Sequence, residues 1–459
     1  MNSIPKIIAA QKTFFASQKT KDANYRLKFL KALKDEILNN EQAVYDALKQ
    51  DFKKSEFEAY LSEFGLVILE LNLAIKNLKK WSKPKRVKSS MLTFPSSDFI
   101  YKEPYGNVLV IAPWNYPFLL AMAPFIMAVS AGNTVVLKPS ELTQNTSKLL
   151  VKIIENIFPE DLAKAVEGDA EIGTELLAQK WDYIFFTGSV EVGKIVAKAA
   201  AKNLTPITLE LGGKSPCIVD DSVDLKLIAR RVVWGKFLNG GQTCIAPDYL
   251  LVKSSIKNEL IDALKTEILM QYGQIIKKSE DFPRIINHKN FERLKRLLNN
   301  ESIAFGGEID ENEKFIGPTI IDQPDLDSSV MSEEIFGPLL PILTFENEAD
   351  IEKVIWYFPK PLSLYVFSKN SSFVEHILGK YSFGGGVVND VLIHFGNQNL
   401  PFGGIGASGM GKYHGKYGFD TFSHQKAIIK RGTWVDPKLR YAPNKGKLSI
   451  IKKMFKYFG

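Results

Sequence analysis

The sequence predicts an α/β fold made of two domains that meet over a cleft, and three observations lead to that prediction. From residue 108 onward, short runs rich in β-branched residues alternate with amphipathic stretches, which is the pattern of βαβ units and a helix-covered parallel sheet. A second region of the same kind follows Leu211. The length of 459 residues is enough for two large domains or three average ones.

The first eighty residues predict helices. Apolar residues recur at three- and four-residue spacing in 25–33 and in 64–73, as they do along one face of an amphipathic helix. Pro84 closes this helical region. The next segment, 87–103, is rich in Ser, Thr, Phe and Ile, and we expect it to form a hairpin that packs against another subunit or another domain.

Strands and helices alternate along the following part of the chain. In the first alternating region we expect strands at 108–111, 134–137, 164–166 and 183–186, and helices at 146–158, 171–178 and 192–201. In the second region we expect strands at 216–219, 249–252 and 362–367, and helices at 225–238 and 257–268. Because parallel sheets bind ligands at the carboxyl ends of their strands, we expect the functional site where the two regions meet.

The net charge of +8 belongs to one end of the chain. Residues 426–459 contain eight Lys and two Arg against a single acid, Asp436, and so carry +9, whereas the rest of the chain carries −1. No nucleic-acid-binding signature accompanies this basic segment, and we therefore expect no nucleic-acid partner.

The same segment ends in a predicted amphipathic helix. Leu448, Ile451, Phe455 and Phe458 fall near one helical face, and the neighbouring lysines stand off that face. A basic amphipathic helix can lie on an anionic membrane, and it can equally dock on protein within its own dimer. Both interpretations stay open at this point.

The chain contains only two cysteines, Cys217 and Cys244, which argues against a disulfide scaffold and for a reducing compartment. No signal peptide is apparent at the N-terminus, and no apolar run approaches the roughly 20 residues of a membrane span. We therefore expect a cytoplasmic protein. The five histidines lack the paired spacing of zinc sites and no GxSxG elbow occurs, so neither a metal site nor serine-hydrolase chemistry is expected.

Two glycine-containing stretches are candidates for phosphate binding. Residues 404–409 match GxGxxG, but they follow no strand and no acidic residue completes a βαβ unit, so we discount this match. Residues 185–193 join a predicted strand to a predicted helix. Gly188 and Gly193 would let the backbone approach a phosphate, and the helix N-terminus would offer free N–H groups. A pair of loop glycines can also serve a turn alone.

Cys244 and Glu210 are the candidate reactive residues. Cys244 closely follows Gly240 and Gly241, which suggests an accessible thiol, although a lone cysteine is usually a small buried hydrophobe. Cys217 lies within a predicted strand and fits that core interpretation. Glu210 ends an apolar strand just before two glycines, and a carboxylate in that position is unusual enough to be a site candidate.

Six motifs, in order between about residues 103 and 424, together resemble the aldehyde dehydrogenase superfamily. They are Pro113-Trp-Asn-Tyr-Pro, Leu137-Lys-Pro-Ser-Glu, Phe186-Thr-Gly-Ser, Leu209-Glu-Leu-Gly-Gly-Lys-Ser-Pro, Gly241-Gln-Thr-Cys and Glu333-Glu-Ile-Phe-Gly-Pro. The short N-terminal region and the stretches that begin at Arg284, Lys360 and Phe402 resemble the class 3, or fatty-aldehyde, branch in particular.

The resemblance implies a Rossmann-like NAD-binding domain, an α/β catalytic domain and a small β element for oligomerisation, with a homodimer as the expected assembly. The implied boundaries are 1–86 and 106–209 for the NAD-binding domain, 210–410 for the catalytic domain, 87–105 and 411–432 for the oligomerisation or bridging element, and 433–459 for the basic amphipathic tail. In that family, residues 404–409 correspond to a structural loop.

The resemblance also implies the reaction, which is NAD(P)-dependent oxidation of medium-chain, long-chain or aromatic aldehydes to carboxylic acids. The Cys244 thiolate would attack the aldehyde carbon to give a thiohemiacetal. The side-chain amide of Asn115 and the backbone N–H of Cys244 would stabilise the oxyanion. Loss of hydride would leave a thioester, and Glu210 would then activate the water that hydrolyses it.

Eight residues are expected to bind the cofactor by the same resemblance: Lys138 and Glu141 at the adenosine ribose, Gly188, Ser189 and Gly193 around the phosphates, and Trp114, Glu334 and Phe336. A carboxylate near the ribose favours NAD, because it accepts hydrogen bonds from the hydroxyl groups and repels a 2′-phosphate. Lys138 could offset that repulsion. We expect NAD, with NADP as the alternative.

Two rival functions share these residues. A CoA-acylating aldehyde dehydrogenase would pass the thioester to a thiol instead of water, and Glu210 argues against it. A binding or structural protein that lost activity is the other rival, and the intact set of Asn115, Glu210 and Cys244 argues against that one.

Overall fold

The first parallel sheet forms where strands and helices begin to alternate. In the computed structural model, which describes residues 3–458, its strand order is β17-β7-β6-β3-β4-β5. The strands are β3 (Asn107–Ile111), β4 (Thr134–Lys138), β5 (Ala163–Ala165), β6 (Tyr183–Thr187), β7 (Ile207–Glu210) and β17 (Gly409–Met410). All are parallel except β17, which pairs antiparallel with β7. The four strands predicted for this region are confirmed.

Helices cover both faces of this sheet because successive strand residues point to opposite sides. Leu109 packs with α1, α8 and α9, whereas Val108 and Val110 pack with α2, α5, α6 and α7. The bounds are α1 (Ile4–Ala16), α2 (Ala23–Asn39), α5 (Gly65–Trp81), α6 (Leu119–Ala131), α7 (Gln144–Ile157), α8 (Ala170–Leu177) and α9 (Val190–Ala201). The helices predicted in 25–33, 64–73, 146–158, 171–178 and 192–201 are confirmed.

The second sheet contains seven strands in the order β10-β13-β14-β9-β8-β15-β16. All neighbours are parallel except β10, which is antiparallel to β13. The strands are β8 (Pro216–Val219), β9 (Tyr249–Lys253), β10 (Ile303–Phe305), β13 (Thr319–Asp322), β14 (Leu339–Phe345), β15 (Ser363–Phe367) and β16 (Gly385–Val388). The three strands predicted here, which correspond to β8, β9 and β15, are confirmed.

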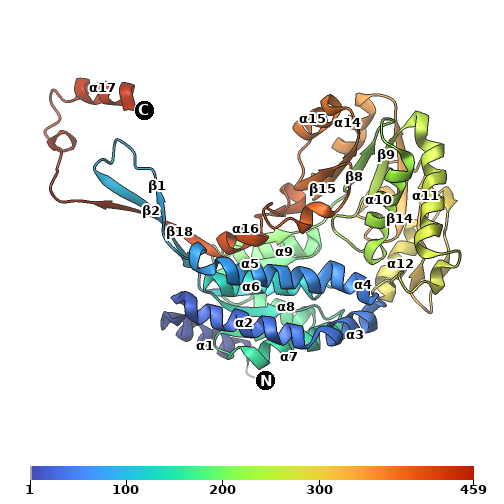
Figure 1. Ribbon diagram of the computed structural model, residues 1–459, viewed down its shortest axis with the longest axis horizontal. Coiled ribbons are helices and arrows are strands. Elements are labelled where there is room, and N and C mark those ends of the chain that lie inside the picture. The colour runs from blue at the N-terminus through green and yellow to red at the C-terminus, as the bar shows by residue number, and fades with distance from the viewer. Residues whose placement is uncertain (1–2, 459) are drawn as a thin grey trace.

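One face of the second sheet packs on α10 and α11, and the other packs on α12, α14 and α15. These helices are α10 (Leu225–Phe237), α11 (Lys257–Tyr272), α12 (His288–Leu297), α14 (Glu348–Tyr357) and α15 (Ser371–Lys380). The two sheets with their helices form two bodies that lie side by side (Figure 1). The smaller elements of the second body are β11 (Ile309–Asp310), β12 (Phe315–Ile316) and α13 (Ser329–Ser332).

A three-stranded arm projects away from the two bodies (Figure 1). The predicted hairpin is present as β1 (Lys85–Val87) and β2 (Ser96–Pro104), and a third strand, β18 (Ser423–Arg431), pairs antiparallel with β2 along nine residues. Before β18 the chain forms α16 (Gly415–Thr421), which packs on α5 and α6.

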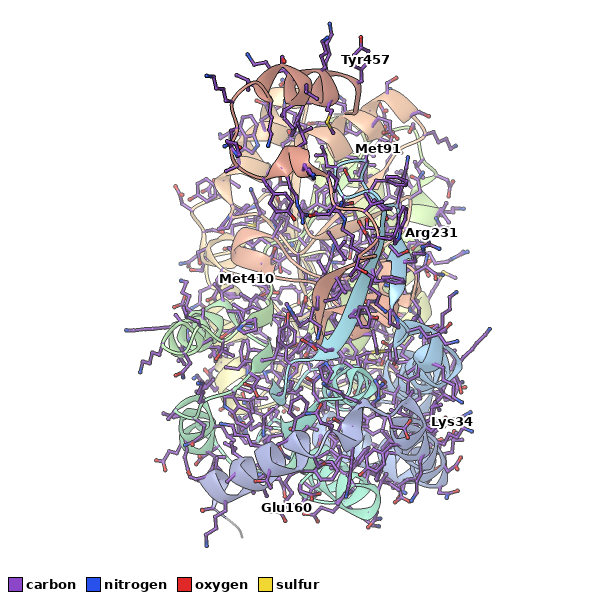
Figure 2. All side chains as sticks on the ribbon, turned by 90° about the vertical axis from the view of Figure 1, so that its left-hand side faces the viewer. Lys34, Met91, Glu160, Arg231, Met410 and Tyr457 are labelled. Carbon is purple, nitrogen blue, oxygen red and sulfur yellow. The ribbon has the colours of Figure 1, made fainter. Side chains whose placement is uncertain are left out.

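The predicted tail helix is present as α17 (Leu448–Phe458), at the end of the molecule where the arm projects (Figure 1). Figure 2 shows Tyr457 of α17 and Met91 of the hairpin loop at that same end, and their side chains are 76 % and 54 % exposed. The side chain of Phe458 lies outside the described part of the chain. Among residues 3–458, no helix is long and apolar enough to cross a membrane.

Candidate active site

The two predicted reactive residues line one cavity, of about 290 Å³, between the bodies. Glu210 is the last residue of β7, and Cys244 lies in the loop between α10 and β9. The other lining side chains come from both bodies and are mainly apolar, including Leu66, Leu119, Trp234, Leu238, Ile393 and Phe395. The cavity therefore offers one thiol and one carboxyl group inside an apolar wall.

A tight backbone turn presents Cys244. Asn239, Gly240 and Gly241 all have positive φ, at 55°, 62° and 74°. A Cβ atom on Gly241 would lie 2.2 Å from the carbonyl oxygen of Gly337. Because that oxygen belongs to the backbone and cannot easily move, position 241 requires glycine. The glycine pair next to the thiol thus serves the turn, and the turn directs the thiol into the cavity.

The side chain of Gln242 locks this turn in place. Its Nε2 donates to the carbonyl oxygens of Asn239 and Arg284, at 3.0 and 3.1 Å, and its Oε1 accepts from the backbone N–H of Ile286 at 3.0 Å. Every bond is buried. A loop that has no regular secondary structure therefore holds the thiol with the rigidity of a packed core.

Burial sets the protonation of Cys244. Burial, with a smaller contribution from the nearby carboxyl groups of Glu334 and Glu210, raises the pKa of the thiol to about 12. Cys217, by contrast, is fully buried within β8, as expected of a core residue, and burial raises the pKa of its thiol too. Of the two sulfur atoms, only that of Cys244 borders the cavity.

Glu210 is buried without a hydrogen-bond partner for either carboxyl oxygen among the described residues. Burial raises the pKa of this carboxyl group well above its ordinary value. Burying a polar group without a hydrogen-bond partner costs free energy. We therefore expect this carboxyl group to be retained for a functional reason. Neither carboxyl oxygen is committed to a hydrogen bond with another described residue.

The discounted GxGxxG stretch holds the Glu210 strand. Gly409 pairs with Glu210 across β17 and β7, and the backbone N–H of Leu211 donates to the carbonyl oxygen of Ser408 at 3.1 Å. A Cβ atom on Gly409 would lie 2.4 Å from the carbonyl oxygen of Leu209. These glycines permit close packing against β7.

Asn115 lies on the loop after β3, next to the cysteine turn. Its Nδ2 donates to the carbonyl oxygen of Gln242 at 3.0 Å, and its own carbonyl oxygen accepts from Asn239 Nδ2 at 2.8 Å. The adjacent Tyr116 and Thr243 hydroxyl groups are 2.6 Å apart and border the cavity. The structure thus places Asn115 against the turn that precedes Cys244, while Cys244 and Glu210 line the cavity. Tyr116 and Thr243 were not predicted as site residues, although both lie inside the motifs that begin at Pro113 and Gly241.

Most of the residues expected to bind the cofactor lie at or just beyond the carboxyl ends of strands in the first sheet. Trp114 follows β3, Lys138 ends β4 and Glu141 lies just beyond it, while Gly188 and Ser189 connect β6 to α9. Lys138 Nζ is 2.5 Å from Glu141 Oε2. This is the edge at which such sheets bind nucleotides.

The start of α9 is shaped by packing and by capping. The Ser189 hydroxyl group accepts from the backbone N–H of Val192 at 3.4 Å. A Cβ atom on Gly193 would lie 2.7 Å from Leu211 Cδ2, and one on Gly188 would lie 2.5 Å from the ring of Phe186. Both glycines therefore also have a purely structural reason to be present.

Glu334 and Phe336 reach the same region from the second body. The rings of Phe336 and Trp114 meet edge to face, with centroids 5.3 Å apart. A Cβ atom on Gly212 would lie 2.0 Å from Glu334 Oε2, so the carboxyl group occupies the space next to this glycine. Burial raises the pKa of Glu334 to about 8. Charged and aromatic groups at strand ends fit a dinucleotide that spans both bodies.

The sequence matches the aldehyde dehydrogenase family over residues 2–428. The chain belongs to the aldehyde dehydrogenase family. It is 46 % identical to a 4,4'-diaponeurosporen-aldehyde dehydrogenase of Staphylococcus aureus (strain NCTC 8325 / PS 47), over 99 % of this chain and 100 % of that protein. It is 45 % identical to aldehyde dehydrogenase family 3 member A2 of Mus musculus, over 95 % and 91 %. A solved structure of the substrate-bound state of Staphylococcus aureus AldH superposes with a TM-score of 0.97, at 46 % identity, over 99 % of this chain and 100 % of that chain.

These matches confirm the class 3 assignment, the two-body α/β fold and the reaction class. This aldehyde dehydrogenase is an NAD(P)-dependent enzyme that oxidises aldehydes to carboxylic acids.

Proposed function

We propose that Cys244, Asn115 and Glu210 divide the oxidation among them. Cys244 reacts as the thiolate after its proton passes to water: Sγ forms the bond to the aldehyde carbon as the carbon–oxygen π bond opens. The oxygen that becomes negative is stabilised by the Asn115 amide and the Cys244 backbone N–H. NAD(P), when bound, supplies the hydride acceptor that converts the thiohemiacetal to a thioester. Glu210 in its ionised form then takes a proton from the water that attacks the thioester, and the Cys244 thiolate leaves as the carboxylic acid forms. The observation that carries this proposal is the shared cavity, which is lined both by a thiol and by a carboxyl group whose oxygens have no hydrogen-bond partner within residues 3–458.

The substrates that fit this cavity are aldehydes with an apolar chain or ring. Its wall is made mainly of aliphatic and aromatic side chains, and no lysine or arginine is among the lining residues. An apolar substrate gains free energy in proportion to the apolar area that it removes from water.

NAD is the cofactor that we propose, with NADP as the alternative. Lys138, Glu141, Gly188, Ser189 and Gly193 would hold the adenosine and phosphate end, while Trp114, Glu334 and Phe336 would hold the nicotinamide end. Glu141 is partly exposed and its carboxylate would repel a 2′-phosphate, although its ion pair with Lys138 reduces that repulsion.

Assembly and location complete the proposal. We assign 1–86 and 106–209 to cofactor binding, 210–410 to catalysis, and 87–105 with 411–432 to a homodimer contact. The arm supports the dimer, since it stands away from both bodies and exposes Phe94 and Ile429. The tail 433–459 would contact the surface of an anionic membrane in the cytoplasm, because α17 exposes apolar and basic side chains together.

The decisive experiment follows NADH formation with octanal or benzaldehyde in the absence of CoA. Wild type should turn over steadily, and Cys244→Ala should be inactive. Glu210→Gln should release one NADH per active site and then stall at the thioester. No turnover without CoA would favour the acylating reaction, and a steady rate near wild type in Glu210→Gln would remove Glu210 from the mechanism.

The membrane contact has its own test. Full-length protein and a variant that lacks residues 445–459 are sedimented with vesicles of anionic phospholipid at low salt, where electrostatic attraction is largest. The full chain should pellet with the vesicles and the shortened chain should not. Equal pelleting of both would exclude docking through α17.

A further inference from the structure

Behind the cavity lies a buried charged cluster that the mechanism above does not use. Lys54, Glu58 and Glu63 are 0 %, 7 % and 0 % exposed. Lys54 follows α3 (Glu41–Phe52), Glu58 is in α4 (Glu56–Ala59), and Glu63 is in the π-helical turn that joins α4 to α5. Ionisable groups removed from water cost free energy, and replacement by apolar residues is often neutral or stabilising. Stability alone is therefore a weak reason for this cluster.

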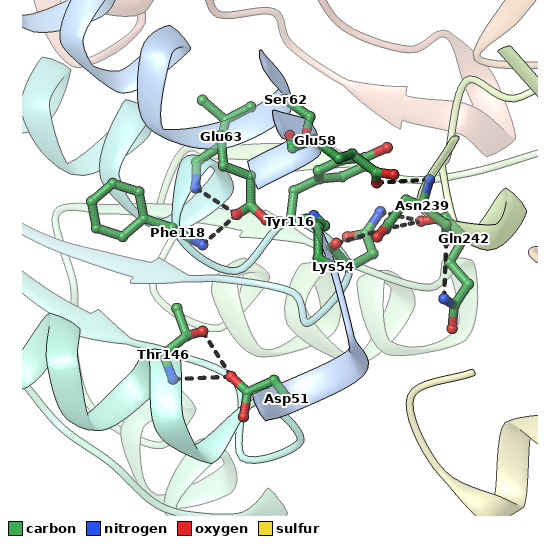
Figure 3. Close-up of polar contacts among 12 residues, drawn as sticks. Asp51, Lys54, Glu58, Ser62, Glu63, Tyr116, Phe118, Thr146, Asn239 and Gln242 are labelled. Atoms are coloured by element: carbon green, nitrogen blue, oxygen red, sulfur yellow. Dashed lines mark hydrogen bonds and ion pairs between the residues drawn. The ribbon is translucent and has the colours of Figure 1, made fainter. Parts of the chain in front are cut away.

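Lys54 and Glu63 hold one side of the segment that contains Asn115 (Figure 3). Lys54 Nζ lies 2.5 Å from Glu63 Oε1 and 4.4 Å from the centre of the Tyr116 ring. Glu63 Oε2 accepts from the backbone N–H of Phe118 at 2.8 Å. The residues directly after Asn115 are thus fixed by two buried charges.

Glu58 holds the other side through Asn239. The Oε1 atom of Glu58 accepts from the backbone N–H of Asn239 at 2.9 Å. The Nδ2 atom of Asn239 donates to the carbonyl oxygens of Asn115, at 2.8 Å, and of Gln242, at 3.2 Å. The Gln242 carbonyl oxygen is also the acceptor for Asn115 Nδ2. One asparagine, tied to Glu58, therefore connects the Asn115 loop to the cysteine turn.

We propose that Glu58 is a positioning residue for aldehyde oxidation, which acts through Asn239 to set the Asn115 amide relative to Cys244. This inference rests on the proposed role of Asn115 as an oxyanion donor. Such a donor stabilises charge only in a narrow geometry, and a misplacement of about 1 Å can cost about 100-fold in rate. The buried cluster would thus be retained because it fixes the position of the Asn115 amide relative to Cys244.

Glu58 can accept the hydrogen bond from Asn239 in either protonation state. Burial raises the pKa of this carboxyl group to about 7, while Lys54 and the Asn239 N–H oppose the rise. Both the charged and the neutral carboxyl group keep an oxygen that can accept from the Asn239 N–H. Glutamine keeps that acceptor as well, so Glu58→Gln should preserve the positioning, whereas Glu58→Ala should abolish it.

The test is a double-mutant cycle of Glu58→Ala and Asn115→Ala, measured as kcat with octanal at saturating NAD. We expect Glu58→Ala to lower kcat about 10- to 100-fold with little change in the KM for NAD, and Glu58→Gln to stay within about 3-fold of wild type. In the Asn115→Ala background, Glu58→Ala should cost less than about 3-fold, because the donor that it positions is already gone. Glu56→Ala, an exposed change on the same helix, is the matched control and should leave kcat unchanged.

Thermal unfolding of each variant establishes that all are folded at the assay temperature. Equal losses from Glu58→Ala in both backgrounds would overturn the inference, and so would a loss in Glu58→Gln as large as that in Glu58→Ala. If Asn115→Ala alone leaves kcat unchanged, the oxyanion role itself fails. If Asn115→Ala lowers kcat and Glu58→Ala does not, only the positioning role fails.

Discussion

The apolar cavity makes a quantitative prediction about substrate length. Each methylene group that is buried contributes about 0.8 kcal/mol, which is roughly a 4-fold gain in kcat/KM at about 1.36 kcal/mol per factor of ten. From butanal to octanal, four added methylene groups should therefore raise kcat/KM by up to about 200-fold. The gain should end once the chain reaches the exposed rim, where Ile393 is 52 % accessible.

The substitution Ile393→Asp tests whether the apolar lining of the cavity binds the substrate chain, because it places a charge at the exposed rim. Octanal should lose about 1–3 kcal/mol of transition-state binding, or roughly 5- to 150-fold in kcat/KM, whereas butanal, which has four fewer methylene groups, should lose less. Ile303→Asp, a change at a comparably exposed isoleucine on β10 outside the cavity lining, is the control. The assay is initial NADH formation with each aldehyde. A flat chain-length profile, or an equal loss for both aldehydes, would refute the reasoning.

Three further predictions concern stability. Glu70 is buried, and the pKa of its carboxyl group is raised from 4.5 to about 7 by burial, so its neutral form stabilises the fold below about pH 4.5 and that contribution is lost as the pH rises through about 7. Between these values the wild type should lose up to about 3 kcal/mol that Glu70→Gln does not lose, and the gap between their melting temperatures at pH 5 and pH 8 measures it. A gap that does not change with pH would contradict this. Gly241→Ala should lower both the melting temperature and the turnover, because its Cβ would meet the Gly337 carbonyl oxygen, whereas Gly379→Ala, with open space around it, should be neutral or stabilising by up to about 1 kcal/mol. Gly193→Ala should lower the free energy of unfolding, measured in urea, by about 1–3 kcal/mol, because the Leu211 side chain must move to admit the new Cβ atom. An unchanged urea midpoint would show that Leu211 moves without a measurable cost.

Much of the fold was predictable because its strands and helices carry local patterns. Strands such as β3 and β8 are short apolar runs next to turns, and α7 has a clear amphipathic period, so their positions followed from the chain alone. The meeting of Glu210 with Cys244 was also predictable, because Glu210 ends a strand of the first region and Cys244 follows a helix of the second, so both were expected where the two regions meet.

Other elements carried no local pattern. Every residue of α6 is buried, so an amphipathic period is missing and periodicity could not reveal it. The strand β18 depends on a partner more than 300 residues earlier, and a sequence pattern gives no information about such pairing.

The cluster around Glu58 could not be predicted for a different reason. The sequence pattern gives no sign that Lys54, Glu58 and Glu63 are buried. Their burial follows from contacts with residues distant in the sequence, such as Tyr116 and Phe118 (Figure 3). Asn239 lies close to the cysteine motif in the sequence. Its proposed role, however, depends on a hydrogen bond from its backbone N–H to Glu58, which is 181 positions away.

The pairing of β2 with β18 also bears on how the chain is made. A ribosome that adds roughly 5–20 residues per second needs on the order of 20–60 s to pass from the end of β2 to the start of β18. During that interval β2 has only the three-residue β1 beside it, so one edge of a nine-residue strand stays open while the first sheet can already fold. Open edges are sites where chains pair with one another. Nascent copies on neighbouring ribosomes are therefore most prone to mispairing before residues 423–431 emerge.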